Sequence, residues 1–267
     1  MKEPLRFLGV MPANVLPFTS DLAIDEPAYR RHLRWLADTR GVTGIVANGH
    51  ASEVSSLNRE ERRRSLAIAL DEVGDACPVI AGVYSDGTQD AVDLARDARA
   101  AGAAGVLVFP PTLFMWGAQL KPDMVLRHFS EIASRADLPI VVFEYPPASG
   151  IGYSPETLAR LAEIPQVAAV KDWSNEIVAF EANLRALHAT GRPVAMLSAF
   201  TMSLMGASCS APTARSRAWA ASRPTCKRSC SRHAARAIST VPDGSTTGWP
   251  RSCPCSTRRR SWTCTTG

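Results

Sequence analysis

The sequence predicts an eight-fold (β/α) barrel over roughly its first 208 residues. Short apolar runs rich in β-branched residues alternate with longer amphipathic runs, a pattern typical of repeated βα units on a parallel sheet. Seven such units follow one another at regular spacing, and no GxGxxG motif follows the first strand. These observations favour a barrel over an open doubly wound sheet.

The strand candidates are short runs of this apolar kind. In chain order they are Phe7–Met11, Gly44–Ala47, Val79–Val83, Gly105–Phe109, Ile140–Glu144, Val167–Lys171 and Val194–Ser198.

Helices are expected between these strands, and two have visible start signals. Asn58 and Glu61 form a capping-box pattern before one helix, and Ser154 with Pro155 precedes another. The remaining helices are expected at Pro27–Thr39, Thr88–Ala101, Pro122–Ala136, Ser174–Ala189 and Phe200–Met205.

The chain changes character near Ser208, which divides it into a barrel at 1–208 and a basic tail at 209–267. The tail has 11 Lys and Arg residues against one acidic residue, Asp243, and six of the seven cysteines. It contains no Leu, Phe, Met or Tyr, and neither a strand period nor a helix period persists in it. We therefore expect a segment of low order.

An out-of-frame translation would explain this composition. Leu and Val codons of GC-rich DNA, read one base late, become Trp and Cys codons. On this hypothesis the eighth strand, due at Gly206–Ala207, and the helices after it are replaced, which would leave two open sheet edges. The alternative to an active enzyme is then a catalytically impaired barrel that retains ligand binding or oligomerisation.

Charge and hydropathy restrict the class of protein. The pI of about 9.0 comes from the tail, so it does not predict a specific nucleic-acid partner for the barrel. No apolar run reaches ~18 residues, and the N-terminal residues lack a signal-peptide pattern. With Cys77 as the one cysteine before residue 209, we expect a cytoplasmic protein without a membrane partner. The tail cysteines lack zinc-site spacing, so no metal is expected.

Lys171 is the sharpest candidate for chemistry. It ends the apolar run Val167–Val170, and side chains at the carboxyl ends of barrel strands face the mouth, where barrel enzymes keep their catalytic groups. Partial removal from water favours the neutral amine, which can attack a carbonyl and form a Schiff base. The alternative is a lysine that extends from the strand end into solvent.

Five segments then occur in a familiar order. They are Gly49–Leu57, Val79–Val83, Ala101–Gly105, Phe143–Pro146 and Val170–Trp173. From about residue 10 to residue 207 the chain resembles the dihydrodipicolinate synthase / N-acetylneuraminate lyase family of Schiff-base aldolases. The resemblance implies a homo-oligomeric (β/α)8 barrel, usually a tetramer, that acts on pyruvate or another 2-keto acid through Lys171. No cofactor is expected, because the lysine serves as the electron sink.

The chain departs from the family pattern in two places. The loop Gly49, His50, Ala51, Ser52 stands where the family reads Gly-(Thr/Ser)-Thr-Gly and holds the substrate carboxylate. His50 or Ser52 could bind that carboxylate, but Ala51 cannot relay a proton. Phe143 stands where the family has its acid/base tyrosine.

Tyr145 is the candidate replacement for that tyrosine. It lies two residues after Phe143, on the same side of the strand, so it could supply the hydroxyl or pack against the barrel rim. Ala148 aligns with an arginine that the synthases use for a dicarboxylate product. The resemblance therefore leaves open an aldolase or dehydratase of a related keto acid.

Overall fold

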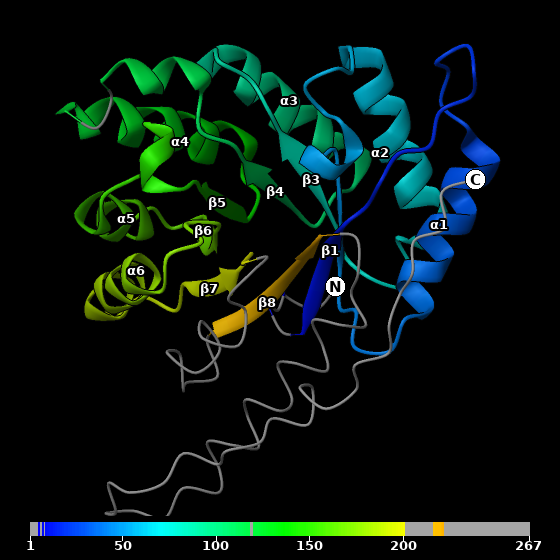
Figure 1. Cartoon of the computed structure of the whole chain (residues 1–267). Helices are drawn as coiled ribbons and strands as arrows, with labels where there is room; N and C mark the ends of the chain where they lie inside the picture. The colour runs from blue at the N-terminus through cyan, green and yellow to red at the C-terminus, as the bar shows by residue number, and fades with distance from the viewer. Residues whose placement is uncertain (1–4, 6, 8, 118–119, 201–215, 222–267) are drawn as a thin grey trace, which may run out of the picture.

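The structure is a computed structural model, and it describes residues 5, 7, 9–117, 120–200 and 216–221. Parallel strands form a closed barrel in which the order in the sheet follows the order in the chain, from β1 to β8 (Figure 1). The strands are β1 (Val10–Ala13), β2 (Ile45–Ala47), β3 (Val79–Val83), β4 (Gly105–Val108), β5 (Ile140–Glu144), β6 (Val167–Asp172), β7 (Ala195–Ser198) and β8 (Ser216–Ala221).

Helices cover the outside of the barrel. They are α1 (Glu26–Asp38), α2 (Arg59–Val73), α3 (Thr88–Ala101), α4 (Pro122–Ala136), α5 (Pro155–Ala162) and α6 (Ile177–Ala189). The short 3-10 segments η1 (His50–Ser52), η2 (Thr112–Trp116) and η4 (Pro147–Ser149) lie in loops that follow β2, β4 and β5. The expected helix at Phe200–Met205 falls outside the described residues, apart from Phe200.

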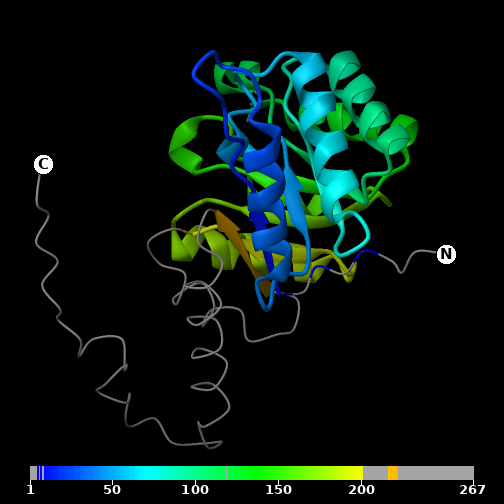
Figure 2. The same ribbon diagram turned by 90° about the vertical axis from the view of Figure 1, so that its right-hand side faces the viewer.

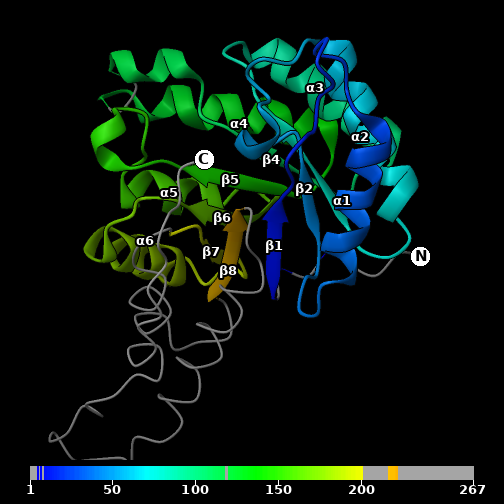
Figure 3. The same ribbon diagram turned by 45° about the vertical axis from the view of Figure 1, so that its right-hand side comes forward.

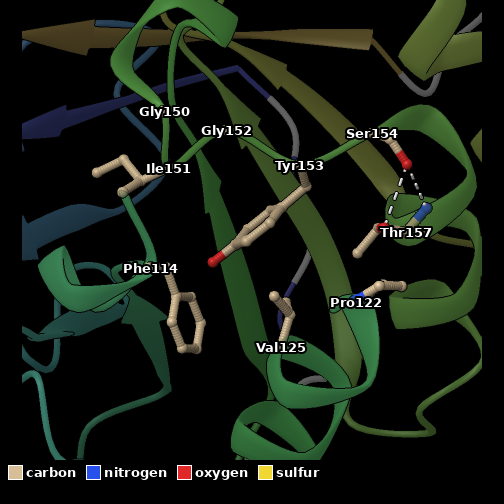
Figure 4. Close-up of a pocket in the computed structure, with 9 residues that line it drawn as sticks. All are labelled: Phe114, Pro122, Val125, Gly150, Ile151, Gly152, Tyr153, Ser154 and Thr157. Atoms are coloured by element: carbon tan, nitrogen blue, oxygen red, sulfur yellow. Dashed lines mark hydrogen bonds between the residues drawn. The ribbon is translucent and has the colours of Figure 1, made fainter. Parts of the chain in front are cut away.

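The start signals read from the sequence operate as expected. Asn58 accepts a hydrogen bond from the Glu61 backbone N–H at 2.9 Å, and Glu61 accepts one from the Asn58 N–H at 2.8 Å, so α2 has a complete capping box. Ser154 accepts from the Thr157 N–H at 3.2 Å and starts α5 (Figure 4). Both caps satisfy backbone donors that the first turn of a helix leaves unpaired.

The barrel is closed by a strand from the tail. The backbone of β8 pairs with β7, from Met196 with Ser216, and with β1, as far as Ala13 with Ala221 (Figure 2 and Figure 3). The expectation of two open sheet edges is therefore wrong. Strand pairing uses backbone N–H and C=O groups, and a short run without proline supplies them whatever its side chains. Residues 201–215 and 222–267, on which the rest of the tail hypothesis depends, lie outside the described part of the chain.

Two apolar layers make up the core. One fills the barrel and includes Met11, Ile80, Leu107 and Phe143, while the other lies between the strands and the helices. Neighbouring strand residues alternate between the two layers, as the pleat of a strand requires. In β5, Val141 and Phe143 face inward and Val142 faces the helices.

A close backbone contact fixes the loop after β2. Asn48 has a left-handed φ of 55°, and a Cβ added at Gly82 in β3 would lie 1.9 Å from the Asn48 carbonyl oxygen. Only glycine allows β3 to approach at this point. The contact sets where the chain leaves β2 and enters the loop that carries His50.

Candidate active site

Lys171 lies near the carboxyl end of β6, half-buried at the mouth of the barrel. It pairs in register with Phe143 of β5, and its Nζ is 3.1 Å from the centroid of the Phe143 ring. A cation at this distance from an aromatic face is attracted by the ring's quadrupole. The amine is thereby held against the inner wall of the barrel.

Aromatic rings adjoin the Phe143 ring that contacts this lysine. The Phe143 ring centroid lies 4.6 Å from that of Tyr145 and 5.1 Å from that of Phe109. Trp173, two residues after Lys171, lies 5.6 Å from Tyr145. Phe143 and Lys171, near the ends of two adjacent strands, and Tyr145 and Trp173, just beyond those ends, therefore contribute to one apolar wall, as alternation along a strand predicts.

His50 faces the same wall from the loop after β2. Its Nε2 and the Tyr145 hydroxyl form a hydrogen bond, although the two residues lie 95 positions apart in the chain. The imidazole packs edge-on against Phe109, with the ring centroids 4.8 Å apart, and lies 5.7 Å from Phe143. The structure thus brings a titratable ring, a phenol and an amine to one place.

The surroundings keep both hydrogen-bonded partners uncharged. His50 keeps exposed surface, but partial removal of its imidazole from water lowers the pKa to about 4, and the positive charge of Lys171 contributes to the same shift. Burial also raises the pKa of Tyr145, with a smaller contribution from Tyr84. At neutral pH the site therefore contains a neutral imidazole hydrogen-bonded to a neutral phenol.

The other residues of the loop that was expected to bind the carboxylate hold that loop against the barrel. The Ser52 hydroxyl is buried and donates to the Asn14 carbonyl oxygen at 2.8 Å, which ties η1 to the end of β1. Ala51 packs against the apolar layer inside the barrel. Gly49 stands where an added Cβ would lie 3.3 Å from the Ala13 side chain. Of this loop, His50 is the residue that the structure places against Tyr145.

Two buried carboxylates lie behind the wall, on the outer side of the same strands. Glu144 and Asp172 pair in register and have no exposed surface. The Glu144 carboxylate accepts the Tyr153 backbone N–H at 3.0 and 3.1 Å, and Asp172 accepts the Ser174 N–H at 2.8 Å and the Asn183 amide at 2.9 Å.

Burial raises the pKa of both acids. For Glu144 the nearby Asp172 acts in the same direction, whereas the Tyr153 N–H opposes the shift. Sequence reasoning missed Glu144. The sequence did contain a sign of it: an acidic residue stands between Phe143 and Tyr145, which face inward, so it must face the helices.

No three metal-binding side chains come close enough to hold an ion within the described ranges. The six cysteines of the tail lie outside them. No helix in the described part of the chain has the length and apolarity to cross a bilayer.

Comparison with known proteins gives a consistent family. A family model described as the dihydrodipicolinate synthetase family matches residues 6–207. A protein of Acidiphilium cryptum named 4-hydroxy-tetrahydrodipicolinate synthase is 36% identical over 62% of this chain and 55% of its own length. A protein of the same name from Acidothermus cellulolyticus is 37% identical over 64% of this chain and 54% of its own. The chain thus matches little more than half the length of these relatives.

Solved structures agree on the fold. Dihydrodipicolinate synthase of Thermotoga maritima superimposes with a TM-score of 0.76 at 24% identity, covering 88% of this chain and 77% of that one. The enzyme of Acinetobacter baumannii, solved in complex with pyruvate, gives a TM-score of 0.75 at 24% identity, covering 88% and 77%. At this level of identity the likeness supports the barrel architecture.

Proposed function

This chain belongs to the dihydrodipicolinate synthetase family, and from that premise we propose that it is a Schiff-base-forming lyase acting on pyruvate or a related 2-keto acid. One observation carries the proposal. Lys171 lies at the carboxyl end of β6, in the barrel mouth, with the Tyr145–His50 pair on the same aromatic wall. An amine, a proton donor and an apolar surround are what imine chemistry requires.

The proposed reaction begins with attack of the neutral Lys171 amine on the C2 carbonyl of the keto acid. The resulting carbinolamine loses its hydroxyl as water after that oxygen is protonated, which leaves a protonated imine. The imine withdraws electrons from C3, so a C3 proton can leave and the enamine can attack an electrophile. Reversal of the last step would cleave a carbon–carbon bond.

Tyr145 is proposed as the acid/base group of these steps. Its pKa is raised, so it holds its proton at neutral pH and can donate it to a leaving oxygen. The loop Gly49, His50, Ala51, Ser52 is proposed to line the side of the site where the carboxylate of the keto acid would lie. Because Ala148 stands where synthases of the family have an arginine, both a synthase and a keto-acid aldolase or dehydratase fit this proposal.

The proposal can be tested without knowing the second substrate. Formation and reversal of the enamine in D2O would replace the methyl protons of pyruvate with deuterium, which proton NMR detects as loss of the methyl signal. We expect wild-type protein and Lys121→Arg to catalyse this exchange and Lys171→Arg to show none. Equal exchange by Lys171→Arg, with its fold retained by circular dichroism, would rule out the lysine.

A homo-oligomer in the cytoplasm is proposed as the working form. Large apolar side chains around the loop after β4 are exposed, among them Leu113, Trp116 and Leu120. Exposed apolar clusters of this kind mark contact surfaces between proteins. Light scattering coupled to gel filtration should give a mass that is a multiple of 28.7 kDa, and a monomer at all concentrations would contradict this part of the proposal.

A further inference from the structure

We propose that His50 acts through Tyr145 as a proton-relay partner, taking and returning the phenol's proton while the imine forms on Lys171. The inference rests on the proposed function, and it assigns His50 a role other than binding the substrate carboxylate. By this account His50 is a positioning residue, because it touches Tyr145 rather than the reacting atoms.

The geometry gives His50 one strong polar contact. Its Nε2 is hydrogen-bonded to the Tyr145 hydroxyl, while its ring contacts the rings of Phe109 and Phe143. Tyr84 adds an edge contact, with the ring centroids 6.1 Å apart. His50 keeps exposed surface, and its ring, which contacts these aromatic neighbours and is hydrogen-bonded to a phenol, is well placed to exchange a proton with it.

The electrostatics suit a group that accepts a proton only transiently. Burial and Lys171 lower the pKa of His50, so the imidazole begins each cycle with a free lone pair on one nitrogen. Its hydrogen-bond partner Tyr145 begins protonated, because burial raises the pKa of the phenol. The imidazolium therefore readily returns the proton to the Tyr145 oxygen as that oxygen gives up its own proton.

The proton balance is closed. Attack by the Lys171 amine gives an ammonium nitrogen and an alkoxide oxygen on the same carbon. The Tyr145 oxygen accepts the proton from that nitrogen while it passes its own proton to His50 Nε2. The imidazolium then returns this proton through Tyr145 to the alkoxide, which gives the neutral carbinolamine. Tyr145 next donates its own phenolic proton to the carbinolamine hydroxyl, which leaves as water, so the protonated imine stands beside a tyrosinate that later accepts the C3 proton. No oxidant, metal or additional proton source is consumed.

The other side chains of the loop after β2 do not offer Tyr145 a proton acceptor. Ala51 has no hydroxyl, and the Ser52 hydroxyl donates to the Asn14 carbonyl. The neighbouring side chains of the loop are therefore unable to take a proton from Tyr145, and His50 is the loop residue already bonded to it. The relay and the carboxylate-binding role predict different kinetic changes when His50 is replaced.

The test compares His50→Gln and His50→Ala with wild type in the pyruvate deuteration assay, at a range of pyruvate concentrations. Glutamine retains a hydrogen bond to Tyr145 but cannot hold an extra proton. His32→Gln on α1 is the matched control, because the His32 ring also accepts a hydrogen bond, from the Val15 N–H at 3.3 Å, outside this site. Melting temperatures establish that each variant folds.

For His50→Gln we expect kcat to fall about 10²-fold or more, the size of a typical acid–base contribution, with KM close to wild type. Free imidazole should restore part of the rate to His50→Ala and none to His50→Gln, where the amide fills the space. His32→Gln should behave as wild type.

Four results would overturn the relay. A raised KM with unchanged kcat in His50→Gln would assign His50 to carboxylate binding. A lowered kcat that imidazole does not restore in His50→Ala would assign it to packing alone. A wild-type protein without exchange would remove the relay together with the proposed function, whereas exchange that survives in His50→Gln at the full rate would remove the relay and leave that function standing.

Discussion

The two faces of β5 and β6 carry different chemistry. The inner face, continued by the residue after each strand, presents Phe143, Tyr145, Lys171 and Trp173, which form an aromatic wall with one amine. The outer face presents two buried carboxylates, Glu144 and Asp172, held by backbone and amide donors. Alternation along the strand is the physical reason that residues next to each other in sequence meet such different surroundings.

The inner face carries the groups proposed for the reaction, and the outer face carries groups that stabilise the fold. Hydrogen bonds to Glu144 and Asp172 come from the segments that follow β5 and β6, so the acids anchor those segments to the barrel. The inner residues interact with one another across the mouth instead. We therefore expect inner substitutions to change reaction rates at constant stability, and outer substitutions to change stability.

The largest effect is expected for Tyr145→Phe. Loss of the hydroxyl removes the proposed acid/base group, so the rate of pyruvate deuteration should fall about 10²- to 10³-fold, while the melting temperature changes little. Tyr84→Phe, a hydroxyl deletion beside the same wall, is the control and should retain the rate. A full rate in Tyr145→Phe would show that Tyr145 is not the proton donor of the inner face.

Asp172→Ala should give the next largest change. It leaves the Asn183 amide and the Ser174 N–H without an acceptor in a buried place, which costs about 2–3 kcal/mol of unfolding free energy. Asp172→Asn keeps an acceptor oxygen and should lose less. Urea denaturation gives both values, and a cost near zero for Asp172→Ala would show that the outer face does not anchor these segments.

Glu144→Gln tests the outer face through pH. The pKa of Glu144 is raised in the folded protein, so the folded state holds this proton at pH values where the unfolded state has released it. The unfolding free energy therefore decreases as pH rises above about 4.5, the pKa of a glutamate in the unfolded chain, because the unfolded state then releases a proton that folded Glu144 retains.

Glu144→Gln removes the pH dependence of the unfolding free energy that arises from this carboxyl group. His50 and His128, whose pKa values are lowered, act in the opposite direction, so the informative quantity is the difference between wild type and variant. Relative to wild type, Glu144→Gln should become more stable as pH rises from 5 to 8 in urea denaturation. A difference that stays constant with pH would mean that the carboxyl is ionised throughout.

Asn58→Ala should have the smallest effect and sets the baseline for the scaffold. Loss of one half of the capping box costs about 1 kcal/mol of unfolding free energy. The site should be unaffected, so the deuteration rate per folded molecule should equal that of wild type. A large loss of rate would mean that α2 controls the position of the His50 loop.

Much of the barrel was predictable because each βα unit carries its own local signals. The bounds predicted at Val79–Val83 and Ile140–Glu144 match β3 and β5, since both strands are continuous apolar runs with clear ends. β8 was missed because its pairing depends on backbone groups and on the gap that β7 and β1 leave. The out-of-frame origin of the tail stays a prediction.

The candidate site was predictable only in part. Alternation along a strand places Tyr145 and Lys171 on the inner side from sequence alone. The hydrogen bond between His50 and Tyr145 joins residues 95 positions apart, and nothing local to either one predicts it. Glu144 was missed because its donors come from a loop backbone, which carries no residue signature.

Borohydride trapping is the most direct test of the central claim that Lys171 forms an imine with a 2-keto acid. The full chain is incubated with pyruvate, reduced, digested and mapped by mass spectrometry. We expect a reduced pyruvate adduct on the peptide that contains Lys171, absent without pyruvate and absent in Lys171→Arg. Folded protein that gives no adduct, or that carries the adduct on Lys121 instead, would show that Lys171 does not form the imine.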